Sequence, residues 1–253
     1  MSRFRDPPIT LSEMDGVRYL HFGSEWVQGA MRIRDPARIE IEYVRQMMAW
    51  LLFLDEGQRI LQLGLGAGAL TRFCHKHLPS AQITVVERSA RVLQAVRQYF
   101  ALPRDDRRLS VLIDDAERHL RAAPAGSQDV IQVDLYDEHA RGPVIDSSPF
   151  YGQCFRVLGQ GSVMAVNLFG DDRGFDASVA RIGEAFEGRV MTLPRTLAGN
   201  VVVLAFKGPA IEIEWSMLER RAQALETMLS LEGSRWVASL RSRSAPASTR
   251  FEI

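Results

Sequence analysis

The glycine-rich segment Gly64-Leu65-Gly66-Ala67-Gly68 constrains the fold of this chain more than any other feature. It follows an apolar, strand-like segment over residues 59–65 and opens a helical pattern over residues 69–77. Glycines at a strand-to-helix turn let the backbone approach a ligand, and the helix N-terminus offers free N–H groups. The sequence therefore predicts a ligand-binding turn at the edge of a sheet. A tight turn without a ligand is the alternative interpretation.

Strand and helix patterns alternate along the middle of the chain. The predicted strands are 59–65, 82–87, 109–113, 129–134 and 162–168, and the predicted helices are 69–77, 91–100, 116–122, 148–157 and 175–186. Such alternation indicates a parallel sheet with helices on both faces, because parallel strands need crossover connections. Two further strands, 190–193 and 200–206, are joined by too few residues for a helix and predict a terminal antiparallel hairpin.

The predicted fold class is thus α/β, with a Rossmann-like seven-stranded sheet of the class I methyltransferase type. Asp15-Gly16 between two apolar runs predicts a β-hairpin near the N-terminus, and residues 38–52 have the periodicity of an amphipathic helix. A helix is predicted over 215–229, followed by a loose end from residue 241. We therefore expect a small β-region over 1–36, a nucleoside-binding catalytic domain over 37–209, and a C-terminal helix with a loose tail over 210–253.

Composition excludes several classes of protein. Lys plus Arg and Asp plus Glu both number 31, so the chain lacks the net charge that gathers nucleic acid or anionic membrane. The longest apolar run, from Met47 to Leu54, is much shorter than the roughly 18 residues that a membrane span needs. The first residues do not have the pattern of a secretory signal, which favours the cytoplasm. Cys74 and Cys154 are too few and too far apart for a metal cluster.

Carboxylates follow the next two strands after the glycine turn. Glu87 ends one strand, 23 residues after Gly64, where a carboxylate can accept both ribose hydroxyls of a nucleoside. The loop lacks the later glycine of the dinucleotide pattern, so adenosylmethionine or a relative fits better than NAD. Asp114 and Asp115 end the following strand, where a carboxylate can meet the amine of adenine. Their alternative role is to cap the helix that begins at Ala116.

The fourth strand ends in a pair of acidic residues, Asp134 and Asp137, on either side of Tyr136. Ligands of open α/β sheets bind at the carboxyl ends of the strands, so both aspartates should face the bound nucleoside. Two carboxylates flanking an aromatic side chain beside a sulfonium favour a cationic substrate.

The chain resembles the spermidine synthase family, the polyamine aminopropyltransferases, and especially its short bacterial members. The resemblance covers about residues 9–207, and the segments that carry it are Val27-Gln28, Tyr43 in EYVRQM, LGLGAGAL at 63–70, VVER at 85–88, IDDAERHL at 113–120, DVIQVDLYD at 129–137 and the run 150–168. The glycine loop is widely shared, whereas the combination of Gln28, Tyr43 and the two aspartates is more specific.

The resemblance implies that decarboxylated S-adenosylmethionine is the co-substrate, with no metal. It places Gln28 and Asp115 around the nucleoside and Glu87 on the ribose, and the glycine loop, with Gly64, Gly66 and Gly68, would line the same pocket. Asp134 is also expected to contact this co-substrate.

On the amine side, the resemblance implies that Asp137 is the general base and that Asp134 and Tyr43 hold the attacking amine. The acceptor would be a polyamine such as putrescine, and the family often forms homodimers. A polyamine nitrogen has a pKa of about 10, so it must lose a proton before it can attack.

The sequence departs from the family's pattern on the amine side. Tyr43-Val44-Arg45 replaces Tyr-His-Glu, and the segment LPRTLAGN lacks the aromatic residue that usually flanks the amine. Two other hypotheses therefore stand beside an aminopropyltransferase. One is a methyltransferase using S-adenosylmethionine, in which Arg45 serves the methionine carboxylate. The other is a non-catalytic protein that binds a nucleoside or a polyamine.

Overall fold

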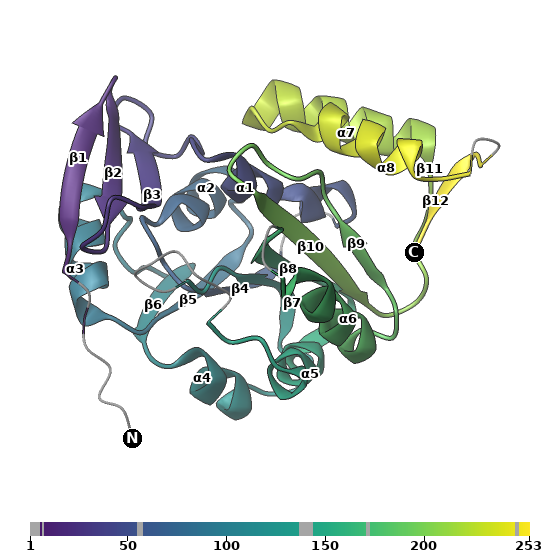
Figure 1. The fold of residues 1–253 in the computed structure, drawn as a ribbon, viewed down its shortest axis with the longest axis horizontal. Coiled ribbons are helices and arrows are strands. Elements are labelled where there is room, and N and C mark those ends of the chain that lie inside the picture. The colour runs from purple at the N-terminus through teal and green to yellow at the C-terminus, as the bar shows by residue number, and fades with distance from the viewer. Residues whose placement is uncertain (1–5, 7, 55–57, 137–143, 171–172, 246–247) are drawn as a thin grey trace.

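A computed structural model describes residues 6, 8–54, 58–136, 144–170, 173–245 and 248–253 (Figure 1). Its centre is a seven-stranded sheet in the order β6-β5-β4-β7-β8-β10-β9. The strands are β4 (Arg59–Leu63), β5 (Gln82–Glu87), β6 (Leu109–Ile113), β7 (Gln128–Val133), β8 (Leu158–Phe169), β9 (Val190–Thr192) and β10 (Asn200–Lys207). Strands β4 to β8 pair in parallel, and β10 runs antiparallel to both β8 and β9. The predicted fold class is confirmed, including the antiparallel hairpin at its end.

Helices cover both faces of this sheet, as Figure 1 shows. Their bounds are α2 (Ala69–His77), α3 (Ala90–Tyr99), α4 (Ala116–Ala122), α5 (Ser148–Val157) and α6 (Phe175–Ala185). Two hydrophobic cores result. One packs α2 and α3 against the sheet, and the other packs α4, α5 and α6 against the opposite face. Because both faces are covered, most side chains of the central strands are apolar on both sides, as is usual in parallel sheets, and Gln62 and Gln132 are buried polar exceptions.

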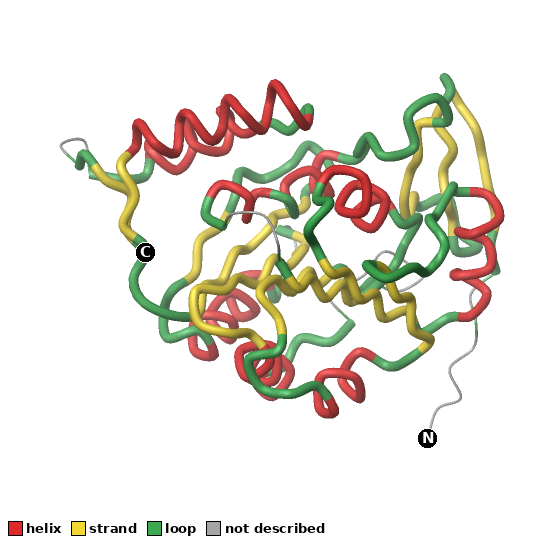
Figure 2. Tube along the Cα trace, turned by 180° about the vertical axis from the view of Figure 1, so that it is seen from behind, coloured by secondary structure: helices red, strands yellow, loops and turns green. Residues whose placement is uncertain are grey.

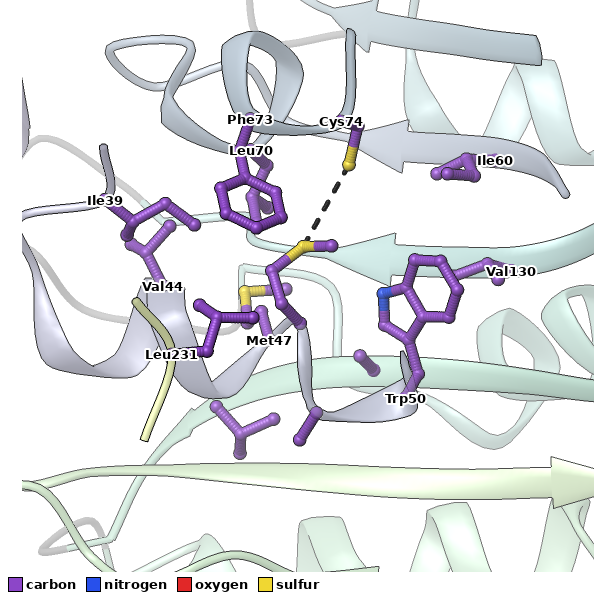
Figure 3. Packing of buried hydrophobic residues seen from close by; sticks show 14 of the residues in the cluster. Ile39, Val44, Met47, Trp50, Ile60, Leu70, Phe73, Cys74, Val130 and Leu231 are labelled. Atoms are coloured by element: carbon purple, nitrogen blue, oxygen red, sulfur yellow. Dashed lines mark hydrogen bonds between the residues drawn. The ribbon is translucent and has the colours of Figure 1, made fainter. Parts of the chain in front are cut away.

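Residues 38–52 differ from the single amphipathic helix that their spacing predicts. They form a short helix α1 (Glu42–Gln46) and a 3-10 helix η1 (Ala49–Leu52). Residues 46–50, which include the completely buried Met47, Met48 and Trp50, are all buried, so this part of the segment has no solvent face. Figure 3 shows Met47 and Trp50 within the core, together with Phe73 of α2 and Val130 of β7. A segment that is buried all round is not held to the helical period by the need to expose one face.

The N-terminal region forms a separate antiparallel sheet of β1 (Thr10–Met14), β2 (Val17–His21) and β3 (Val27–Arg32). The predicted hairpin turn is present, since Asp15 and Gly16 have φ angles of 52° and 74°. Two consecutive left-handed residues are typical of the turns that match strand twist.

The C-terminal region contains more structure than the expected helix and loose tail. Its elements are β11 (Glu212–Glu214), α7 (Trp215–Leu229), α8 (Gly233–Ser242) and β12 (Arg250–Glu252). Strand β12 pairs with β11, and the buried ring of Phe251 lies 5.4 Å from that of Phe53 and 5.7 Å from that of Trp215. A single buried aromatic side chain anchors this polar segment.

Figures 1 and 2 show the N-terminal sheet and the α7–α8 pair at opposite ends of the same side of the central sheet. None of the described helices is long and apolar enough to span a bilayer.

Candidate active site

The glycine turn between β4 and α2 makes close backbone contacts with two other segments. Gly64, Gly66 and Gly68 have φ angles of 94°, 50° and 73°, a conformation that favours glycine. A Cβ atom on Gly64 would lie 2.3 Å from the carbonyl oxygen of Asp134, and one on Gly66 would lie 3.2 Å from that of Gln28. The turn is therefore held against the carboxyl end of β7 on one side and against β3 on the other.

Strand β3 covers the glycine turn from the N-terminal sheet. A Cβ atom on Gly29 would lie 2.5 Å from the Cβ atom of Ala67, so only glycine fits at this crossing. This contact carries the neighbouring Gln28 to the same place.

One pocket brings together residues that are far apart in the sequence. Five predicted site residues are among those that line it: Gln28, Tyr43, Gly64, Gly66 and Asp134. Gly68 lies within the turn as the N-cap of α2. Among the described lining residues, Asp134 has the only charged side chain. In the part of the chain that the structure describes, the pocket therefore combines a glycine-rich wall with the carboxylate of Asp134.

Glu87, at the end of β5, is tied to the glycine turn. Its Oε2 accepts a hydrogen bond from the backbone N–H of Leu65 at 3.1 Å, and its Oε1 accepts one from that of Ser89 at 2.7 Å. Burial raises the pKa of Glu87, and these backbone donors oppose the shift. The carboxylate thus lies beside the glycine turn, where the sequence predicts it.

Asp114 and Asp115 follow β6 at the same edge of the sheet. The side chain of Asp115 caps α4 by accepting a hydrogen bond from the N–H of Arg118 at 3.1 Å. Asp114 forms an ion pair with Arg118, and its backbone N–H donates to the carbonyl of Glu87 at 3.1 Å. Asp115 therefore does cap this helix, and its contact with adenine stays a prediction. Neither aspartate is among the described residues that line the pocket.

Asp134 is held by a short chain of polar side chains. Its Oδ1 accepts a hydrogen bond from Nδ2 of Asn167 at 3.0 Å, and its Oδ2 accepts one from the hydroxyl of Tyr43 at 3.3 Å. The Oδ1 of Asn167 in turn accepts from Nδ2 of Asn200 at 3.0 Å. Four segments, α1, β7, β8 and β10, thus fix the orientation of one carboxylate.

The electrostatics of this group suit a cationic ligand. Burial raises the pKa of Asp134, although the donors Asn167 and Tyr43 partly oppose the shift. Burial and the neighbouring carboxylate raise the pKa of Tyr43 well above its usual value, so its hydroxyl stays protonated and donates. A half-buried carboxylate that accepts hydrogen bonds from neutral donors, as Asp134 does from Asn167 and Tyr43, is stabilised by a bound cation.

Sequence reasoning missed Asn167 and Asn200. Asn167 lies near the end of the apolar strand β8, and Asn200 begins β10. A polar residue at the carboxyl end of a buried parallel strand was the available signal for Asn167. The pairing of β10 with β8, which brings Asn200 to its neighbour, has no local signal. Asp137, the predicted general base, lies outside the described residues.

Arg45 does not line the pocket. Its Nη1 donates to the carbonyls of Ile39 at 3.1 Å and Glu40 at 2.8 Å, and its Nη2 donates to Oε1 of Glu232 at 3.1 Å. The guanidinium is thus engaged with backbone and with the C-terminal region.

Neither cysteine has the character of a reactive group. Cys74 and Cys154 are both buried, and burial raises the pKa of the Cys74 thiol to about 12. Among the described residues, no three His, Cys, Asp or Glu side chains gather into a metal-binding group.

The sequence model of the spermine/spermidine synthase domain family matches residues 40–168 of this chain. The polyamine aminopropyltransferase of Chromobacterium violaceum is 33% identical over 93% of this chain and 90% of its own length. Two solved structures share the fold at 23% identity. A probable spermidine synthase from Corynebacterium glutamicum has a TM-score of 0.73, covering 86% of this chain and 83% of that chain. A spermidine synthase in complex with the transition state analogue AdoDATO has a TM-score of 0.60, covering 79% and 74%. The chain therefore belongs to the spermine/spermidine synthase family.

Proposed function

We propose that this protein is a polyamine aminopropyltransferase. It transfers the aminopropyl group of decarboxylated S-adenosylmethionine to a polyamine acceptor such as putrescine. Membership of the family and the name of the Chromobacterium relative support this activity. The solved spermidine synthase that binds AdoDATO supports the choice of co-substrate.

The observation that carries the proposal is the charge of the pocket. Among its described lining residues the single charged side chain is the half-buried carboxylate of Asp134. Ordinary S-adenosylmethionine carries a methionine carboxylate, which would need a cation there. Arg45, the residue suggested for that role, is occupied by two carbonyls and by Glu232. The decarboxylated form lacks this carboxylate and keeps the ammonium group that both forms carry.

On the nucleoside side, the glycine turn and Gln28 contact the adenosine. The carboxylate of Glu87 accepts hydrogen bonds from the ribose hydroxyls. The backbone ties of Glu87 to Leu65 and Ser89 support this placement, because they hold its carboxylate beside the turn. Asp114 and Asp115, at the end of β6, lie next to Glu87 through the backbone bond from Asp114 and would meet the adenine.

On the amine side, Asp134 and the hydroxyl of Tyr43 hold the acceptor nitrogen. Asp137 takes the proton as the general base. The deprotonated nitrogen then attacks the propyl carbon attached to sulfur, a new C–N bond forms, and the C–S bond breaks. Its electron pair stays on sulfur, so the second product is neutral 5′-methylthioadenosine. Because the sulfonium is already a good leaving group, alignment of the two substrates supplies much of the acceleration.

The test is product identification. Purified protein is incubated with putrescine and either decarboxylated or ordinary S-adenosylmethionine, and the products are analysed by mass spectrometry. We expect spermidine and 5′-methylthioadenosine from the decarboxylated form. Methyl transfer alone would establish the methyltransferase alternative, and no turnover with either nucleoside would establish the non-catalytic one. The cytoplasmic location and the homodimer stay predictions.

A further inference from the structure

The turn between α7 and α8, residues 230–232, lies against the helix that carries Tyr43. Leu231 is buried in the same core as Val44 and Met47, and Figure 3 shows its side chain beside that of Met47. The turn is fixed on its other side as well, because a Cβ atom on Gly233 would lie 2.7 Å from the carbonyl oxygen of Ala222 in α7. The C-terminal helices therefore present a rigid surface to α1.

Charged side chains join this surface to α1 on either side of Tyr43. Arg45 donates to Oε1 of Glu232 at 3.1 Å, and Arg235 of α8 donates to Oε1 of Glu42 at 2.8 Å. Arg235 also lies 3.8 Å from Oε2 of Glu232, which links the two pairs. Four charges thus alternate between α1 and the C-terminal helices.

Helix α1 depends on its contacts with the rest of the fold, these ion pairs among them, because its own hydrogen bonds are few. It has only five residues, and its N-cap Ile41 provides no side-chain hydrogen bond. Isolated helices of this length are unstable, because the entropy lost in nucleating a helix exceeds the stabilisation from a single turn of hydrogen bonds. Arg45, once oriented by Glu232, also donates to the carbonyls of Ile39 and Glu40 just before the helix.

We infer that Glu232 and Arg235 are positioning residues for the acceptor amine. They hold α1 so that the hydroxyl of Tyr43 stays within reach of Asp134, while the nucleoside side of the pocket does not depend on them. The inference rests on the proposed function, because it assigns Tyr43 to the amine. A region outside the catalytic sheet thereby sets the affinity for one substrate only.

The kinetic test uses Glu232→Ala and Arg235→Gln. We expect each to raise the KM for putrescine about two- to fivefold, which is the loss typical of a partly exposed ion pair, with the KM for the nucleoside unchanged. Arg235→Lys keeps the charge and should restore most of the affinity. The matched control is Glu219→Gln, which removes the Arg241–Glu219 pair between the same two helices away from α1 and should leave both KM values unchanged.

A second readout is independent of activity. Hydrogen exchange of the peptide covering residues 39–48 should be faster in Glu232→Ala than in wild type, with the peptide covering 109–122 unchanged. An unchanged KM for putrescine, or an equal rise in both KM values, would overturn the positioning role. If the wild type transferred no aminopropyl group, the proposed function would fail. Unchanged hydrogen exchange at residues 39–48 would instead show that Glu232 does not hold α1 in place.

Discussion

The two halves of the pocket are built in different ways. In the nucleoside half, the glycine turn and Glu87 belong to one stretch of the chain, residues 64–87, and are held mainly by contacts with backbone atoms. The amine half combines side chains from Tyr43, Asp134, Asn167 and Asn200, which belong to four separate elements. Backbone contacts tolerate side-chain changes elsewhere, whereas a chain of side-chain hydrogen bonds depends on every member. Substitutions should therefore separate the two halves, and amine recognition should be the more fragile.

The largest effect is expected for Asp134→Asn. Removing the charge that pairs with the amine should cost about 2 kcal/mol or more, which lowers kcat/KM for putrescine by a factor of about 30 or more. The affinity for 5′-methylthioadenosine, measured by calorimetry, should stay near the wild-type value. The matched control is Asp129→Asn, which should leave the kinetics unchanged. Asp129 lies just before the apolar part of the same strand and pairs with Arg59. Equal losses for both ligands would contradict the separation.

Glu87→Gln tests the nucleoside half of the pocket. A carboxylate that accepts ribose hydroxyls contributes about 1.5–3 kcal/mol, so the affinity for 5′-methylthioadenosine should fall about tenfold or more. The KM for putrescine, measured at saturating nucleoside, should be little affected. A variant that bound the nucleoside normally would remove Glu87 from the site.

A buried polar network joins the two halves beneath the pocket. The hydroxyl of Thr71 donates to Gln62 at 2.6 Å, Gln62 donates to Gln132 at 2.9 Å, and Gln132 donates to the carbonyl of Met47, the C-cap of α1, at 3.0 Å. Gln62→Leu and Gln132→Leu should each lower the free energy of unfolding by about 1–2 kcal/mol, because each leaves a buried partner unsatisfied. In urea unfolding, the double variant should lose less than the sum of the two single losses. Strict additivity would show that the two glutamines act independently.

The smallest effect concerns pH. Because burial raises the pKa of Asp134 above the ordinary value of 3.8, its charged form accumulates only as the pH rises through that raised value. The acidic limb of kcat/KM for putrescine should therefore lie above the range of an exposed aspartate, and activity should be lost as the pH falls through it. In Asp134→Asn the contribution of Asp134 to this limb should disappear, while protonation of the proposed base Asp137 still limits activity at low pH. If the limb stayed at the same pH, another group would be responsible for it.

The predictable part of the site is the part with local or topological rules. The position of the glycine turn, the place of Glu87 and the approach of Asp134 all follow from one rule, that parallel strands present their carboxyl ends at the same edge of the sheet. The capping by Asp115 also has a local cause, since a helix follows it directly.

The remainder depends on contacts that no local pattern encodes. Asn200 reaches Asn167 only because β10 pairs antiparallel with β8. Arg45 has the same sequence context whether it faces a ligand or Glu232, and only the position of α8 decides between them. The polar C-terminal end looked loose because one buried residue, Phe251, is too weak a signal in a segment rich in serine and arginine.

The central claim is that the pocket selects a cationic aminopropyl chain over a methionine carboxylate. Calorimetric titration of the wild-type protein with decarboxylated and with ordinary S-adenosylmethionine tests it most directly. We expect the decarboxylated form to bind about tenfold more tightly or better, because the half-buried carboxylate of Asp134 attracts the ammonium group of both ligands but repels the carboxylate that only the ordinary form carries. Equal affinities, or tighter binding of ordinary S-adenosylmethionine, would contradict the account.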